Sequence, residues 1–175
     1  MAKYLINEEY DVEDAGAAKG FVRGERREDY ADPWRETGNV ILIGLPGSGR
    51  ARLAELLAER TGKPTLAPTD GQSTVEALQG SGAIVVLEDK LVDHPEVQPL
   101  IHGAGKVFYL MADTRLLSGR VAEREGLDEV DDLWRELSAR LAMVEPTFYG
   151  VLHFILQATQ SPEELVDDAL EKIGY

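Results

Sequence analysis

The segment from Gly44 to Ala51 carries the clearest chemical signal in the chain. It reads Gly-Leu-Pro-Gly-Ser-Gly-Arg-Ala, between an apolar run and an amphipathic stretch, which is the context of a phosphate-binding loop. Glycines let backbone N–H groups turn inward, and the N-terminus of a following helix favours an anion. We therefore expect phosphate or nucleotide contacts here; the alternative is a strand-to-helix turn with no ligand. The expected contact residues are Gly44, Pro46, Gly47, Ser48, Gly49, Arg50 and Ala51.

The last two positions of this loop depart from the usual G-x-x-x-x-G-K-[ST] pattern, in which the Lys reaches the phosphates and the hydroxyl binds Mg²⁺. Arg50 stands in place of the Lys and Ala51 in place of the hydroxyl residue. Arg50 can supply the cation, although its planar fork is longer and bulkier than an ammonium group. Ala51 removes one direct metal ligand, so Mg²⁺ binding is expected to be weakened but not excluded.

Carboxylates that follow expected strands are candidates for catalysis and metal binding. Glu88 and Asp89 end the apolar segment AIVVLED, and an acid at such a strand end holds Mg²⁺ in many P-loop enzymes. In one interpretation Arg50, Asp70 and Asp89 surround a phosphate and a metal ion, with Asp70 and Arg50 as catalytic residues. In the other, Glu88 and Asp89 simply face solvent, as is common in an acid-rich chain.

Short apolar runs alternate with amphipathic segments from Asn39 onward, which is the pattern of an α/β domain with a parallel sheet. The expected strands are 40–43, 65–67, 83–87, 107–110 and 151–156. The expected helices are 50–60, 73–79, 95–102, 115–124, 129–143 and a last one from about 161 to 173. Residues 39–175 are therefore expected to form one domain, with the glycine loop at the end of its first strand.

Composition limits the partners. The 175 residues carry a net charge of -14, so we expect no binding to nucleic acid or to an anionic membrane. A small phosphate ligand is still allowed, since local N–H groups and a few Arg side chains hold it. The chain has no cysteine, no signal-like start and no apolar run of membrane-spanning length, which favours the cytoplasm. Residues 1–38 lack a sustained period and are expected to be an extension, either a surface arm or a lid or partner-binding arm.

From about Asn39 to the C-terminus the sequence resembles the shikimate kinases, in the nucleoside-monophosphate-kinase-like branch of P-loop folds. The resemblance is carried by NVILIGLPGSGRARLAELLAERTGKP, PTD, GKVFYLMAD, VEPTF and SPEELVDDALEKI. It implies a three-layer fold in which helices flank a five-stranded parallel sheet of order 2-3-1-4-5. It also implies ATP or ADP at the loop, with Mg²⁺, shikimate beside it and a mobile lid after the fourth strand. Arg115, Arg120 and Arg124 fall on that lid segment, where Arg115 and Arg124 would contact phosphate; solvated helix positions are the alternative.

Several positions that serve the chemistry of this family have changed. The family's Asp-x-Asp matches 68–70, where Pro68 replaces the acid that organises the metal and Asp70 keeps the one that binds the substrate hydroxyls. The segment 71–82 is too short for the family's hairpin and contains no Arg. Glu88-Asp89-Lys90 replace a Gly-Gly-Gly turn, and Val144 stands where a second carboxylate-binding Arg is expected.

These changes favour one function over two others. The leading hypothesis is a shikimate-kinase-like P-loop protein that binds nucleotide or phosphate weakly and has lost shikimate phosphorylation. The first alternative is an active ATP-dependent small-molecule kinase, for shikimate or for another acceptor. The second is an interaction protein that binds no ligand and uses residues 1–38. The glycines of the phosphate-binding loop are kept in the sequence. The hydroxyl residue that binds the metal, one of the two acids and the Arg residues that bind the substrate are replaced or missing.

Overall fold

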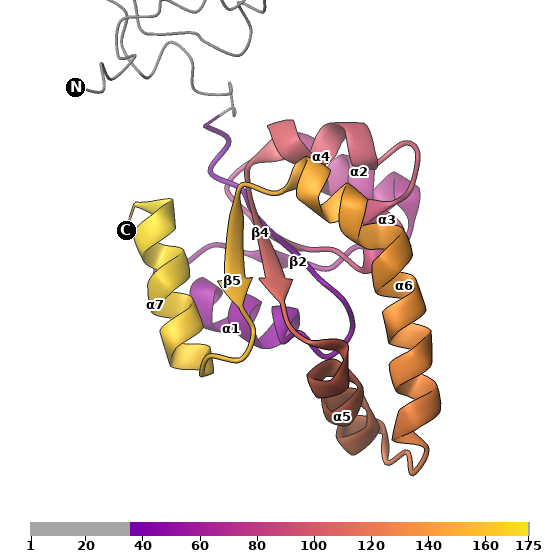
Figure 1. Ribbon diagram of the computed structural model, residues 1–175. Helices are drawn as coiled ribbons and strands as arrows, with labels where there is room; N and C mark the ends of the chain where they lie inside the picture. Colours follow the sequence, from indigo (N-terminus) through magenta and orange to yellow (C-terminus); the bar gives the residue numbers. More distant parts are fainter. Residues whose placement is uncertain (1–35, 175) are drawn as a thin grey trace, which may run out of the picture. The chain divides into compact units, whose positions relative to one another are not determined.

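A computed structural model of the chain describes residues 36–174 (Figure 1). Within this range the chain forms one five-stranded parallel sheet with the order β2-β3-β1-β4-β5, which confirms the predicted fold class. The strands are β1 (Val40–Ile43), β2 (Thr65–Leu66), β3 (Ile84–Val86), β4 (Lys106–Met111) and β5 (Phe154–Gln157). The predicted extension 1–38, with its lid or partner-binding role, lies outside the described residues except for 36–38.

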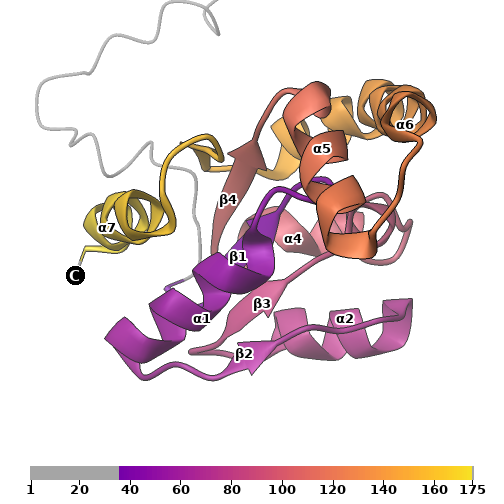
Figure 2. The same ribbon diagram turned by 90° about the horizontal axis from the view of Figure 1, so that it is seen from below.

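Helices cover both faces of the sheet (Figures 1 and 2). They are α1 (Arg50–Thr61), α2 (Gly71–Gln79), α3 (Asp89–Val92), α4 (Gln98–Ala104), α5 (Thr114–Glu125), α6 (Val130–Val151) and α7 (Pro162–Ile173). Successive side chains of β1 point to opposite faces of the sheet and enter two different hydrophobic clusters. Val40 and Leu42 pack with α1 and α7, while Ile41 and Ile43 pack with the cluster that includes α4 and α6. Strands buried on both faces read as continuous apolar runs, which is why β1 is visible in the sequence.

The helix α6 differs from the sequence prediction. We expected a helix ending at Met143 and a strand starting at Val151, but α6 continues to Val151 with Pro146 inside it, and β5 begins only at Phe154. The buried side chains Val144, Phe148 and Val151 continue the helical spacing past the proline. Packing of that apolar face against the core therefore outweighs the hydrogen bond that Pro146 removes.

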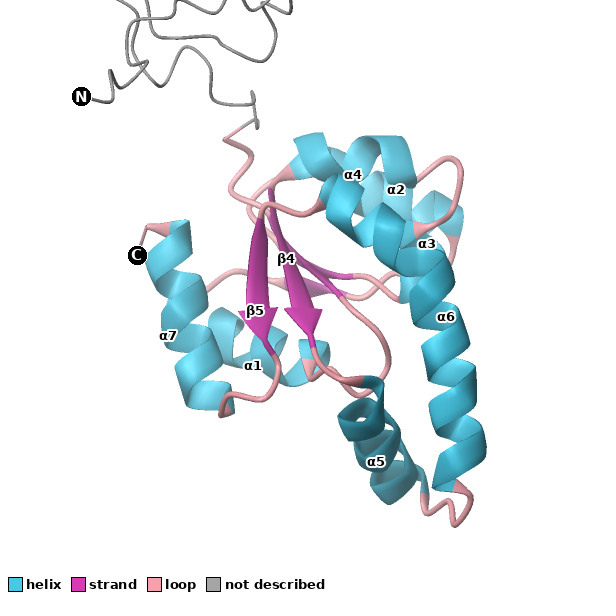
Figure 3. Cartoon of the chain, viewed as in Figure 1, coloured by secondary structure: helices cyan, strands magenta, loops and turns pink. Residues whose placement is uncertain are grey.

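The carboxyl ends of the strands meet at one edge of the sheet, as required of parallel strands. The arrowheads of β4 and β5 point to this edge, from which α5 leaves the sheet (Figure 3). The loop after β1 and the residues after β3 lie at the same edge, because both strands pair in parallel with register Val40 to Ile84. In such sheets ligands bind outside the carboxyl ends of the strands. Within residues 36–174, no helix has both the length and the hydropathy of a membrane-spanning segment.

Candidate functional site

The loop between β1 and α1 is shaped by its glycines. Gly47 has φ +84°, and a Cβ built on it would lie 2.8 Å from the backbone oxygen of Leu117 in α5. A side chain at this position would therefore be strained and would push the loop away from α5. Gly49, with φ +89°, turns the chain into the first residue of α1. The two glycines let the loop fold tightly under α5 and bring the start of α1 to the edge of the sheet.

The N-terminus of α1 has no side-chain cap. Its N-cap residue is Gly49, whereas Asp70, Asp113 and Ser161 cap the helices α2, α5 and α7 through side-chain oxygens. The first-turn N–H groups of a helix lack intrahelical acceptors, and they carry the positive end of the helix dipole. In α1 no side chain among residues 36–174 caps these groups, so they are open to an external acceptor at the position where the loop pattern predicted a phosphate.

A cavity of about 750 Å³ opens beside this loop, within the volume range of small-molecule sites. It extends from the loop past the end of β3 to α5 and α6. The cavity is lined by Pro46, Gly47, Gly49, Arg50, Ala51, Arg52, Ala67, Pro68, Thr69, Val86, Glu88, Asp89, Lys90, Arg120, Arg124, Glu125 and Arg140. Most of the predicted loop residues and both predicted metal ligands are thus brought together.

The charge of the cavity is opposite to that of the chain. Five Arg side chains and one Lys line it, against the three acids Glu88, Asp89 and Glu125. The chain as a whole carries -14. Clefts lined by charges of one sign raise the local concentration of ligands of the opposite sign. An anion is therefore the class of ligand that this cavity favours.

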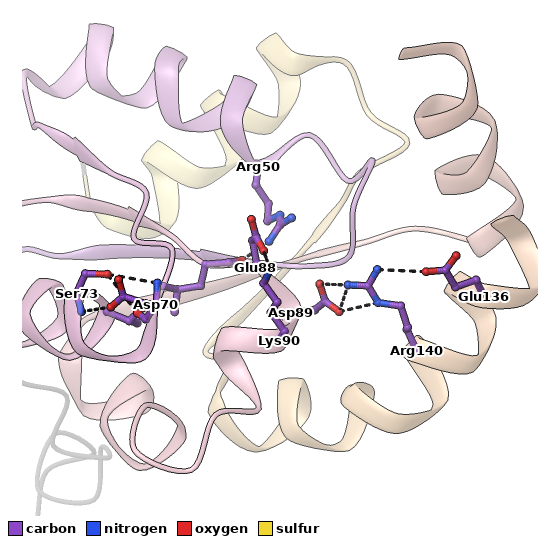
Figure 4. Close-up of polar contacts among 10 residues, drawn as sticks. Arg50, Asp70, Ser73, Glu88, Asp89, Lys90, Glu136 and Arg140 are labelled. Atoms are coloured by element: carbon purple, nitrogen blue, oxygen red, sulfur yellow. Dashed lines mark hydrogen bonds and ion pairs between the residues drawn. The ribbon is translucent and has the colours of Figure 1, made fainter. Parts of the chain in front are cut away.

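Arg50 spans the space between the loop and the end of β3. Its Nη1 donates a hydrogen bond to the carbonyl oxygen of Leu87, and its guanidinium lies beside Glu88 (Figure 4). Burial lowers the pKa of Arg50 from its ordinary value, while the carboxylates of Asp89 and Glu88 act to raise the pKa. An Arg guanidinium is not deprotonated in proteins, so Arg50 supplies a positive charge at this point of the cavity.

The two acids after β3 are both held by cations. Asp89 is buried, with 6% of its surface exposed, and it accepts hydrogen bonds from Arg140 of α6. The Nε–Oδ2 distance is 3.0 Å and the Nη2–Oδ1 distance is 2.7 Å, so the contact is bidentate. Glu88 pairs with Lys90 at 3.0 Å (Figure 4). These acids start the short helix α3, which the sequence did not predict.

Asp70, the predicted catalytic base, has a structural task. Its Oδ1 accepts a hydrogen bond of 2.8 Å from the backbone N–H of Ser73, which makes it the N-cap of α2 (Figure 4). This N–H group is the main cause of a lowered pKa of Asp70. The side chain is exposed, and the neighbours Pro68 and Thr69 line the cavity rather than Asp70 itself. The catalytic role of Asp70 stays a prediction.

The three Arg residues of α5 take different positions. Arg124 lines the cavity and pairs with Glu125 at 3.1 Å. Arg120 also lines it, and its guanidinium donates to the carbonyl oxygens of Gly47 and Ala158 at 3.3 and 2.9 Å. Arg115 lies elsewhere: it pairs with Asp131 at 3.0 Å and lies 3.8 Å from the centre of the Trp134 ring. Phosphate contact by Arg115 and Arg124 stays a prediction, and the geometry favours Arg124.

A smaller hollow of about 300 Å³ shares Arg120 and part of the loop with the first cavity. Its walls include Ser48, Arg52, Leu53, Ala158 and Pro162. The Ser48 side chain is buried, and its Oγ has no hydrogen-bond partner among residues 36–174. A buried hydroxyl without a partner is costly and needs a reason. The hollow is mostly apolar and lies beside the charged loop.

The residues at the cavity fit a divalent metal poorly. Among residues 36–174 no group of three His, Asp or Glu side chains could hold a metal ion. Glu88 and Asp89, the predicted ligands, pair with Lys90 and Arg140, and Ala51 offers no side-chain oxygen. In nucleotide sites Mg²⁺ takes one or two carboxylates together with phosphate and water oxygens. Both carboxylates here already pair with cations, so they fit the predicted Mg²⁺ site poorly, and metal binding by Glu88 and Asp89 stays a prediction.

Arg140 is a residue of the site that was not predicted from the sequence. It lies on α6 four residues before Val144, the position that aligned with a family Arg, and residues four apart lie on the same helix face. Val144 itself is buried, with 5% of its surface exposed. The helical pattern and the basic residue were visible, but the sequence did not show that Arg140 meets Asp89.

Comparison with solved structures agrees with this fold. Shikimate kinase from Acinetobacter baumannii in complex with shikimate has a TM-score of 0.67 at 17% identity, covering 77% of this chain and 92% of that one. Shikimate kinase from Bacteroides thetaiotaomicron has a TM-score of 0.68 at 15% identity, covering 78% and 98%. The YorR protein from Bacillus subtilis in complex with phosphorylated GDP has a TM-score of 0.61 at 15% identity, covering 77% and 95%.

The chain therefore has the fold of the shikimate kinases and related small-molecule kinases, as the sequence resemblance predicted. These identities are low, so the likeness concerns the fold. No protein-family model matches the sequence, and a search of curated proteins gives no match.

Proposed function

We propose that the cavity binds a nucleotide, or another small molecule with a phosphate group, and that the chain no longer phosphorylates shikimate. The observation that carries the proposal is the meeting of the uncapped N-terminus of α1 with Arg50, Arg120 and Arg124 at one cavity. Backbone N–H groups and Arg forks are the groups that recognise phosphate oxygens. Since several of these cations are already paired or hydrogen bonded, we expect weak binding.

A nucleotide suits the site better than inorganic phosphate. The hollow beside Arg120 offers apolar walls next to the loop, so a base and a phosphate chain can be held together. YorR carries phosphorylated GDP, and deoxyadenosine kinase from M. mycoides, of TM-score 0.52, carries dCMP and dCDP. We therefore propose ADP or ATP as the first ligands to test, with Ser48 turning its hydroxyl toward the ligand.

Loss of shikimate phosphorylation is inferred from the acceptor side of the cavity. The second Arg expected to grip the shikimate carboxylate is replaced by the buried Val144. Arg140 lies nearby but already holds Asp89 through both oxygens. Each charge-assisted contact that is lost weakens binding by about 1.5 to 3 kcal/mol. Without these contacts, shikimate is a poor ligand for this chain.

An active ATP-dependent kinase, for shikimate or for another acceptor, is the second candidate. The cavity continues from Arg50 to Ala67, Pro68 and Thr69, which leaves room for an acceptor beside the phosphate chain. Asp70 follows directly and is the residue that would serve as base. A cytoplasmic location and a protein partner for residues 1–38 are further parts of the proposal and rest on the sequence alone.

Titration calorimetry with ADP and ATP, followed by a coupled assay with shikimate, tests the proposal. We expect saturable heat at millimolar nucleotide and no product from shikimate. Absence of heat with both nucleotides would contradict the binding site. Turnover of shikimate at an ordinary kinase rate, removed by Asp70→Asn, would support the second candidate and contradict the first.

A further inference from the structure

The carboxylates that a divalent cation would use at this site are already neutralised. Asp89 is held by both Nε and Nη2 of Arg140, and Glu88 pairs with Lys90. Arg140 also lies 4.0 Å from Glu136, which helps to fix it on α6. The end of β3 thus presents two acids and two cations before Arg50 is counted. A metal ion approaching this point would meet no net negative charge.

The Arg50 side chain lies between the loop and the two acids that follow β3 (Figure 4). Its guanidinium hydrogen bonds to the Leu87 carbonyl oxygen and lies beside Glu88, on the route from the uncapped end of α1 to the end of β3 (Figure 4). A guanidinium presents several N–H donors in a planar fork that matches phosphate oxygens. The position therefore combines a fixed positive charge with the donors needed to bridge two phosphate groups.

Ala51 completes the change on the loop side. A hydroxyl at this position would provide an oxygen for a metal ion, and Ala51 provides only a methyl group. The cavity still holds an excess of basic over acidic side chains. Such a field favours a polyphosphate that keeps its full charge over one that a metal ion has partly neutralised.

We propose that this cavity binds the polyphosphate of a nucleotide without Mg²⁺, with the Arg50 guanidinium acting in place of the divalent cation. The inference deepens the proposed function and rests on it. It makes free ADP or ATP the preferred ligand, and Mg²⁺ a competitor that withdraws nucleotide from the protein. A phosphate-binding loop with a Lys and a hydroxyl behaves in the opposite way, because there the metal ion joins the loop to the ligand.

The test is a calorimetric titration of the full chain with ATP and with tripolyphosphate, in EDTA and in excess Mg²⁺ at equal ionic strength. We expect a Kd about fivefold lower in EDTA, the factor that one additional solvated charge contact at about 4 Å contributes. Tripolyphosphate should show the same preference, since the effect arises at the phosphate chain. Manganese added to the ATP complex should give no electron paramagnetic resonance signal of a protein-bound ion.

Two variants should reverse the preference. Arg140→Gln releases the Asp89 carboxylate and removes one cation, so Mg²⁺ should tighten ATP binding. The double variant Arg50→Lys/Ala51→Ser restores the metal-binding loop pattern and should do the same; it changes a half-buried and an exposed residue, so it keeps the test available if Arg140→Gln fails to fold. Arg135→Gln, which alters an exposed pair with Asp132 on the same helix, is the matched control and should keep the wild-type preference.

The outcomes separate this inference from the proposed function. Tighter binding of ATP in EDTA, reversed in the double variant, supports it. Tighter binding in Mg²⁺ by the wild-type chain overturns it while leaving a nucleotide site in place. No binding of ATP or tripolyphosphate in either condition overturns the proposed function and the inference together.

Discussion

Arg140 of α6 holds Asp89 of α3 through a bidentate ion pair, with Nε–Oδ2 at 3.0 Å and Nη2–Oδ1 at 2.7 Å. The pair joins residues 51 positions apart, and it fastens α6 to the end of β3 at the cavity wall. The side chain of Asp89 is 8% exposed and that of Arg140 is 35% exposed. The Asp89 carboxylate is therefore shielded from solvent, whereas the Arg140 side chain is partly solvated.

Removal of Arg140 should destabilise the fold. Arg140→Gln leaves the buried Asp89 carboxylate without its charged partner, and we expect a loss of about 1.5 to 3 kcal/mol in the free energy of unfolding. The loss should be smaller than for a fully buried pair, because water reaches the Arg side. Urea unfolding measures it, with Arg135→Gln as control and an expected change within about 0.5 kcal/mol. Equal losses in the two variants would contradict the role of the pair.

Gly47 should tolerate no side chain. Gly47→Ala places a Cβ 2.8 Å from the Leu117 oxygen at φ +84°, so stability should fall by at least about 1 to 2 kcal/mol. ADP binding should weaken as well, because the loop must shift. The control is Gly119→Ala in α5, where a Cβ meets nothing within 4 Å. That change should stabilise the chain by about 0.5 to 1 kcal/mol. Thermal unfolding of both variants measures these changes. An unchanged melting temperature for Gly47→Ala would show that the loop is not packed against α5.

Arg120 should matter more for nucleotide than for bare phosphate. Arg120→Ala removes both hydrogen bonds that join α5 to the loop and to Ala158, and it opens one wall of the smaller hollow. We expect ADP affinity to fall about tenfold, the effect of one charge-assisted hydrogen bond, and tripolyphosphate affinity to fall less. Arg60→Ala, which alters an exposed pair with Asp167, serves as control. Equal losses for ADP and tripolyphosphate would contradict a base-binding role for the hollow.

Asp70 should behave as a helix cap with a pH-dependent contribution. Asp70→Ala should lower the melting temperature at neutral pH, while Asp70→Asn should nearly preserve it, since Asn also caps helices. The pKa of Asp70 is lowered in the folded state. The stabilisation is therefore present above the ordinary Asp pKa of about 3.9 and is lost as the pH falls through the lowered value. Melting curves at neutral and strongly acidic pH test this: the Asp70→Ala deficit should shrink in acid, and a constant deficit would exclude the charged cap.

The centre of the sheet could be predicted from the sequence because β1, β3 and β4 are almost fully buried. Residues 40–43 and 107–110 are continuous runs of apolar residues, and the glycines indicate the loop between β1 and α1. The end of α6 could not be predicted. Pro146 reads as a helix stop, and only the core contacts of Phe148 and Val151 show that the helix passes it. The local sequence pattern did not predict the end of α6, because packing against the core outweighs the hydrogen bond that Pro146 removes.

The loop of the candidate site could be predicted from the sequence, but its ion pairs could not. Arg50 and Ala51 are adjacent in the sequence, so their departure from the usual loop can be read directly. Asp89 looked like a metal ligand because it follows a strand. Its pairing with Arg140 depends on how α3 and α6 pack, which no local pattern encodes. The same reason separates Arg124, which lines the cavity, from Arg115, which lies against Trp134.

The most direct test of the central claim, an anion site for a nucleotide at this cavity, compares ADP titrations of the wild-type chain and of Arg50→Gln in EDTA. We expect saturable binding by the wild type and a Kd at least about tenfold higher for the variant, since a charge-assisted contact is lost. Circular dichroism of both proteins should show the same helix content. Absence of ADP binding by the wild type, or equal affinity in the folded variant, would contradict the account.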